Sequence, residues 1–149
     1  MKSIHEWLSE YEESHKHPKN VLIHKVCVPA IMFSILGLLW IVPIGFANFN
    51  CSQIFVAITL IFYAKLSIRL CLGMICEVGI MLAVIWHIQQ SRISLLATCL
   101  FIFIIAWIFQ FFGHKIEGKK PSFFQDLFFL LIGPLWTLNL LYKRLGIRV

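Results

Sequence analysis

The sequence predicts an all-α, multi-pass integral membrane protein, organised as a single membrane-embedded domain over residues 1–149. Of its residues, 60% are hydrophobic and only 13% are charged, whereas a soluble domain has about 45–50% apolar and about 25% charged residues. Long apolar runs also recur along the chain, and a helix satisfies its own backbone hydrogen bonds in lipid. We expect a helical bundle of four to five membrane segments, preceded by a helix at the membrane surface.

The first expected element is the surface helix, over residues 3–17. Ser3 followed by Glu6 has the capping-box pattern that begins many helices. An apolar edge follows, made by Trp7, Leu8 and Tyr11. Pro18 should end this helix, because proline lacks an N–H group and disfavours helical geometry at the residue before it. Proline is also a favoured first residue of a helix, so we expect a second helix to begin there.

The apolar runs predict the remaining elements in order. The second helix should extend over residues 18–41, with a bend at Pro29, and residues 43–50 form a turn-rich loop. Three further apolar segments are expected at 52–64, 66–86 and 93–112, followed by a polar loop at 113–121. The last run covers 122–144 and contains Gly133-Pro134 at its middle, so a broken, re-entrant pair of helices is an alternative to a straight span.

The charges indicate a membrane topology and exclude one class of partner. The net charge is +6, but the basic residues lie at the ends of apolar runs, without the basic stripe of a nucleic-acid-binding protein. We therefore expect membrane lipids as partners and no nucleic acid. An excess of Lys and Arg marks the cytoplasmic side. With a cytoplasmic N-terminus, this rule places His15, His24 and His114 on the cytoplasmic side and His87 on the opposite side.

Three histidines are candidate metal ligands. Residues four apart share a helical face, which pairs Tyr11 with His15, Asn20 with His24, and Gln110 with His114. In one continuous helix His15 and His24 would point in opposite directions, because nine residues make two and a half turns. The break at Pro18 allows the three rings to converge at the membrane surface.

Several chemistries are compatible with such a cluster. Imidazole suits iron, zinc, copper or nickel; zinc would indicate hydrolysis and iron would indicate oxygen chemistry. Glu117 is either a further ligand or the partner that orients an imidazole. Asn20 and Gln110 are candidates to orient ligands or substrate, and Lys119 and Lys120 are candidates to meet an anionic head group. A scaffold whose histidines only contact lipid head groups is the alternative without enzyme activity.

Two blocks resemble a known membrane family. They are SHKHPKNVLIHKVCVPAIMFS at 14–34 and AWIFQFFGHKIEGKKPSFFQDL at 106–127, which are similar to the signature blocks of the Mpo-type 2-hydroxy fatty acid dioxygenases. Residues 35–105 match that family only in character. The resemblance implies an Fe(II)-dependent dioxygenase that uses O2 to shorten long-chain 2-hydroxy fatty acids by one carbon, an α-oxidation that belongs to phytosphingosine breakdown.

The resemblance also implies roles for individual residues. It implies that His15, His24 and His114 are iron ligands and that Glu117 occupies the acidic position of the family. His87 is a candidate fourth ligand, with His17 as the alternative. Asn20 and Gln110 match the family as candidate catalytic residues, and the predicted substrate-binding residues are Tyr11, Lys119 and Lys120.

The motifs depart from the family pattern at two points: Ser14 stands where the family has a tyrosine, and Glu117 follows Gly113-His114 one residue sooner than in the fungal member. The chain is most similar to the compact bacterial members. That similarity implies a bacterial inner membrane, or the endoplasmic reticulum in a eukaryote, with the metal site on the cytoplasmic side. A zinc-dependent membrane lipid hydrolase remains the alternative enzyme.

Overall fold

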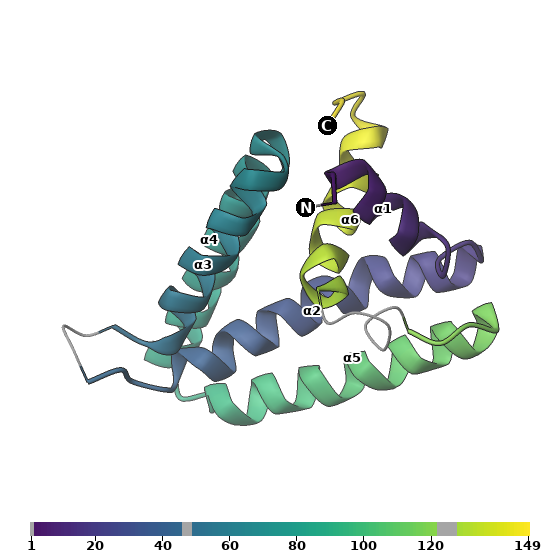
Figure 1. Ribbon diagram of the computed structural model, residues 1–149. Coiled ribbons are helices and arrows are strands. Elements are labelled where there is room, and N and C mark those ends of the chain that lie inside the picture. Colours follow the sequence, from purple (N-terminus) through teal and green to yellow (C-terminus); the bar gives the residue numbers. More distant parts are fainter. Residues whose placement is uncertain (1, 46–48, 122–127) are drawn as a thin grey trace. The chain divides into compact units, whose positions relative to one another are not determined.

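The computed structural model describes residues 2–45, 49–121 and 128–149 (Figure 1). All the named elements in these ranges are α-helices, which confirms the predicted all-α class. They are α1 (Ile4–Glu12), α2 (Pro18–Trp40), α3 (Cys51–Leu66), α4 (Ile68–Gln90), α5 (Leu95–Glu117) and α6 (Phe129–Arg144).

The chain divides into two compact units. Unit 1 consists of Met1–Pro29 and Ile105–Val149, and unit 2 consists of Ala30–Ile104. The first half of α2 and the second half of α5 thus belong to unit 1, together with α1 and α6, which pack against each other. The single-domain organisation stays a prediction.

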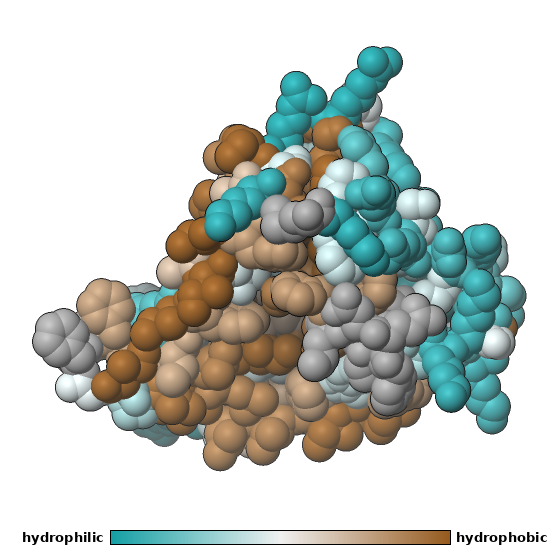
Figure 2. All heavy atoms as spheres, viewed as in Figure 1, coloured by the Kyte–Doolittle hydropathy of each residue, from teal (hydrophilic) through white to brown (hydrophobic). Residues whose placement is uncertain are grey.

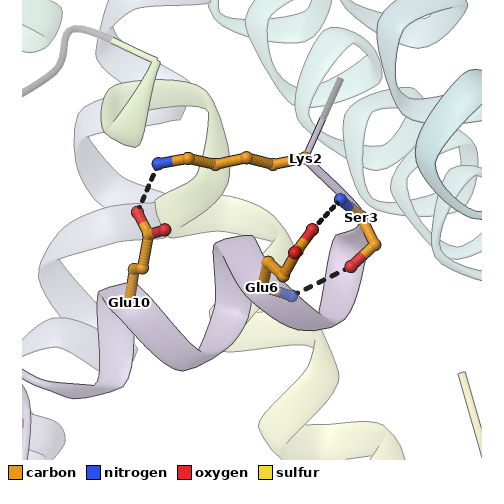
Figure 3. A network of polar contacts seen from close by, with 4 residues as sticks. All are labelled: Lys2, Ser3, Glu6 and Glu10. Atoms are coloured by element: carbon orange, nitrogen blue, oxygen red, sulfur yellow. Dashed lines mark hydrogen bonds and ion pairs between the residues drawn. The ribbon is translucent and has the colours of Figure 1, made fainter.

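Helix α1 begins as its sequence predicts. The Ser3 hydroxyl oxygen accepts a hydrogen bond from the Glu6 N–H at 3.3 Å, and the Glu6 carboxylate accepts one from the Ser3 N–H at 2.6 Å (Figure 3). Lys2 pairs with Glu10 at 2.7 Å across the same helix. The predicted apolar edge is buried. The capping box begins the helix, and the buried edge packs within unit 1, where α1 contacts α6.

The end of α1 differs from the prediction. The helix stops at Glu12 and not at residue 17. The N–H groups of Lys16 and His17 donate to the side chain of Glu117. Pro18 also disfavours helical geometry at His17, the residue before it. Residues 13–17 therefore form a turn between α1 and α2, and this turn carries His15.

Three of the described helices are long and apolar enough to cross a membrane: α2, α4 and α5. Helix α3 is also apolar but has only 16 residues. The most apolar windows of α4 and α5 are only 28% and 22% buried inside the protein. An apolar helix with so little protein cover is suited to a lipid environment, so the helices support a membrane protein.

The structure corrects one predicted boundary, at the end of α5, and shows no helix break at the position where the sequence left one open. Helix α5 continues to Glu117, so residues 113–117 are helical although a loop was predicted there. Helix α6 runs without a break through Gly133 and Pro134. Proline removes the hydrogen bond to the carbonyl four residues earlier and its ring crowds that carbonyl, which here belongs to Leu130 in the first turn of α6. Residues 122–127 of the last run lie outside the described residues.

In unit 2, α3 and α4 pack against each other. Ser67 is both the last cap of α3 and the first cap of α4, and its hydroxyl accepts a hydrogen bond from the Leu70 N–H at 3.4 Å. The two helices therefore form a hairpin with a single connecting residue.

Polar side chains gather in unit 1. Figure 2 shows hydrophilic residues over α1, the start of α2 and the end of α5, whereas the visible side of α5 before that end is hydrophobic. The histidines lie among these polar ends. A site at this position would meet the aqueous edge of the membrane segments.

A candidate metal centre of three histidines

Unit 1 brings the three predicted histidines together. His15 lies in the turn after α1, His24 in the second turn of α2 and His114 in the last turn of α5. One ring nitrogen from each lies within 4.8 Å of those of the other two. The exposed fractions of these side chains are 4%, 1% and 4%. The three imidazoles therefore form one buried cluster, assembled from parts of the chain about 90 residues apart.

Two of the rings have a defined tautomer. The Nδ1–H of His15 donates to the Tyr11 carbonyl at 2.6 Å, and the Nδ1–H of His24 donates to the Asn20 carbonyl at 3.0 Å. A carbonyl oxygen only accepts, so Nδ1 must be the protonated nitrogen of each ring. Burial lowers the pKa of His15 to about 4, so this ring is neutral near pH 7. Nε2 of His15 therefore presents a lone pair, as a metal ligand must, and Nε2 of His24 does so in the neutral ring.

Two of the ring nitrogens lie as close together as two ligands of one cation. Nε2 of His24 lies 3.1 Å from Nε2 of His114. Two nitrogens that each bind one ion at about 2.0–2.1 Å, at close to a right angle, lie about 3 Å apart. In the part of the chain that the structure describes, the buried Nε2 of His15 has no hydrogen-bond partner. A metal ion would satisfy this lone pair, and neutral imidazoles suit iron or zinc.

Glu117 joins the end of α5 to the turn before α2. Its carboxylate accepts hydrogen bonds from the Lys16 N–H at 3.0 Å, the His17 N–H at 2.8 Å and the Asn20 side-chain amide at 3.1 Å. The same amide nitrogen donates to the Ser14 carbonyl at 3.1 Å. We call Glu117, Asn20 and these backbone groups the Glu117 clasp. It encloses the two residues that flank His15 in sequence, and it lies one turn from both His24 and His114.

Aromatic rings cover His15. Tyr11 stacks on it with ring centroids 4.1 Å apart and planes 5° apart. Trp136 of α6 lies 5.1 Å from His15 and 5.2 Å from Tyr11, and only 1% of it is exposed. The sequence did not single out Trp136, because its run LLIGPLWTLNLL reads as an apolar segment throughout. Its place at the candidate site becomes evident only from its contact with the His15 ring.

The other predicted site residues occupy different surroundings. Gln110 is buried one turn before His114, whereas Lys119 and Lys120 are exposed. The Lys119 ammonium donates to the Glu13 carbonyl at 2.7 Å. His87 is exposed in the last turn of α4, in unit 2, and is not one of the three clustered histidines. The predicted roles of these four residues stay predictions.

Comparison with known proteins identifies the family. The model of a family described as "2-hydroxy-palmitic acid dioxygenase Mpo1-like" matches residues 1–145. The 2-hydroxy-palmitic acid dioxygenase MPO1 of Saccharomyces cerevisiae is 32% identical over 121 residues, which cover 80% of this chain and 68% of the yeast protein. No solved structure matches the chain. The match over almost the whole length, together with the identity to the yeast enzyme, shows that this chain belongs to the Mpo1-like family.

Proposed function

We propose that this protein is an Fe(II)-dependent membrane dioxygenase that shortens long-chain 2-hydroxy fatty acids by one carbon. The observation that carries the proposal is the buried, three-histidine cluster, in which Nε2 of His15 and Nδ1 of His114 have no hydrogen-bond partner among the described residues. Its support is the family, whose yeast member is named for dioxygenation of 2-hydroxy-palmitic acid. The substrate, the iron and the use of O2 are inferred for this chain from those two sources together.

The proposed reaction needs no other oxidant or reductant. The bond between C1 and C2 of the substrate breaks, C1 leaves as CO2, and C2 becomes the carboxyl carbon of the shortened acid. One oxygen atom of O2 enters the new carboxyl group and the other leaves as water. The electrons lost by C1 and C2 equal those that O2 accepts, so the reaction balances.

His15, His24 and His114 would hold the metal. Bound Fe(II) would supply O2 activation and a positive charge for the substrate's carboxylate and 2-hydroxyl oxygens. The chain's own contribution is orientation and exclusion of water. The Tyr11 and Asn20 carbonyls hold two rings in the ligating tautomer, and Tyr11 and Trp136 cover His15. The Glu117 clasp would position the two segments that carry the ligands.

The surroundings suit an amphiphilic substrate. Lys119 and Lys120 are exposed just beyond α5, where their charges would attract a fatty-acid carboxylate to the aqueous edge. The hydrocarbon tail would stay among the apolar segments. The positive-inside pattern supports a multi-pass protein with this edge on the cytoplasmic side. The proposed membrane is a bacterial inner membrane, or the endoplasmic reticulum in a eukaryote.

A direct assay tests the proposal. Membranes that contain the protein are supplied with Fe(II), 2-hydroxypalmitate and 18O2, and the lipid products are read by mass spectrometry. We expect pentadecanoate with one 18O atom, and no shortened acid from palmitate, which lacks the 2-hydroxyl group. Absence of the shortened acid from protein that demonstrably holds iron would refute the proposed reaction.

A further inference from the structure

We infer that the indole N–H of Trp136 binds the carboxylate of the 2-hydroxy acid at the three-histidine centre. This inference rests on the proposed function, because it assigns a binding partner to the substrate of that reaction.

The indole nitrogen of Trp136 is a buried donor without an acceptor. Trp136 is 1% exposed, and in the described part of the chain its Nε1 atom has no hydrogen-bond partner. An indole N–H can only donate. Native proteins pair nearly all such buried groups, and an exception calls for an explanation such as an absent ligand. The centroid of the Trp136 ring lies 5.1 Å from that of the His15 ring, so the unpaired donor belongs to a ring that borders the candidate metal centre.

Three of the side chains at the site already use their buried donors, whereas Nδ1 of His114 is, like Nε1 of Trp136, buried without a partner in the described residues. Nδ1–H of His15 donates to the Tyr11 carbonyl and Nδ1–H of His24 donates to the Asn20 carbonyl. The Asn20 amide donates to the Ser14 carbonyl and to Glu117. The indole N–H of Trp136 can therefore donate to a ligand oxygen that enters the cluster, whereas the donors of His15, His24 and Asn20 are already in use.

The electrostatics of the site favour a carboxylate as the acceptor. No lysine or arginine is among the buried polar residues of the described ranges, so a carboxylate that enters the site needs neutral donors besides the metal. A hydrogen bond to a charged acceptor is stronger than one to a neutral acceptor, and low polarity strengthens it further. A carboxylate also has two acceptor oxygens, so it can accept from Trp136 with one of them.

A pair of tryptophan variants tests the inference. Trp136→Phe removes the N–H group and keeps an aromatic ring. Trp7→Phe is the matched control, because Trp7 is also buried with an unpaired indole nitrogen, but its ring contacts involve Phe128 and Phe129 of unit 1 and not the histidines. Both variants are loaded with zinc, which binds imidazole without redox chemistry.

Binding of radiolabelled 2-hydroxypalmitate and of its methyl ester is then measured on the detergent-solubilised proteins. We expect Trp136→Phe to weaken binding of the acid roughly tenfold or more, the loss typical of one hydrogen bond to a charged group. Binding of the uncharged ester should change little, and Trp7→Phe should resemble the wild type with both ligands.

Unchanged binding of the acid to zinc-loaded Trp136→Phe would overturn the inference, as would an equal loss for acid and ester. If the phenylalanine variant fails to retain zinc, 3-benzothienylalanine at position 136 replaces the N–H group with sulfur and keeps the bicyclic ring, and the same criteria apply. A wild-type protein that binds the acid but never shortens it when loaded with iron would refute the proposed function alone, because the binding comparison does not depend on turnover.

Discussion

The side-chain oxygen of Asn20 lies directly against the α-carbon of Gly113. A β-carbon on residue 113 would meet Asn20 Oδ1 at a distance that real side chains do not adopt. Asn20 is fully buried, and its amide nitrogen is held by Ser14 and Glu117. Glycine at 113 thus allows the start of α2 to approach the end of α5, and the next residue along α5 is His114.

Gly113→Ala should therefore disturb the metal centre. The added methyl group must displace Asn20, at a cost of about 1–3 kcal/mol for overpacking, and the displacement separates His24 from His114. We expect lower thermal stability in detergent and a reduced content of bound metal. The matched control is Gly79→Ala in α4, where an added β-carbon meets nothing within 4 Å. That change should be neutral or stabilising by up to about 1 kcal/mol. Equal metal contents in the two variants would contradict the packing argument.

Glu117→Gln should weaken the Glu117 clasp while leaving the three histidines in place. A glutamine has one acceptor oxygen and no charge, so it cannot accept from Lys16, His17 and Asn20 together. Because Glu117 is only half-buried, we expect a modest destabilisation, about 1 kcal/mol. Metal affinity should fall roughly tenfold, as for other residues that orient ligands.

Competition with a chelator of known affinity measures this loss. The control is Glu13→Gln, which removes an exposed carboxylate from the same turn. If Glu117 were itself a ligand, its loss would resemble that of a histidine, and a much larger fall in affinity would therefore favour direct ligation.

Substitution of the clustered histidines should abolish metal binding. His24→Ala and His114→Ala each remove one of three ligands, so we expect affinity to fall by more than roughly 10²-fold, beyond the effect of an orienting residue. His87→Ala should retain the metal, because His87 is exposed in unit 2. Metal analysis by mass spectrometry distinguishes these cases. Loss of metal from His87→Ala would instead establish His87 as the fourth protein ligand.

The histidine cluster could be anticipated because its positions follow local rules. Proline at 18 separates two helices, and spacings of four residues relate Tyr11 to His15 and Asn20 to His24. In the structure these same spacings reappear as hydrogen bonds from each imidazole to the carbonyl four residues earlier. Local sequence could also predict the start of α1, since a capping box involves only neighbouring residues.

Features that depend on distant contacts could not be anticipated in this way. The end of α1 was placed five residues too late, because the turn after Glu12 is held partly by Glu117, about 100 residues away. The residues GHKIE were read as a loop from their polarity, yet α5 includes them. Trp136 resembles its apolar neighbours until α6 packs it against His15. Each difference arises from packing within unit 1, which a local pattern does not encode.

Removal and replacement of the metal should distinguish an iron-dependent dioxygenase from a zinc-dependent lipid hydrolase. A chelator should abolish turnover of 2-hydroxypalmitate, and Fe(II) under air should restore it. Zinc should bind the same imidazoles but should not restore turnover, because it has no redox chemistry, whereas Fe(II) can activate O2 at open positions. Added zinc should therefore inhibit the iron enzyme in competition with Fe(II). If zinc alone restored a lipid-cleaving activity without oxygen, the same three histidines would belong to a membrane hydrolase.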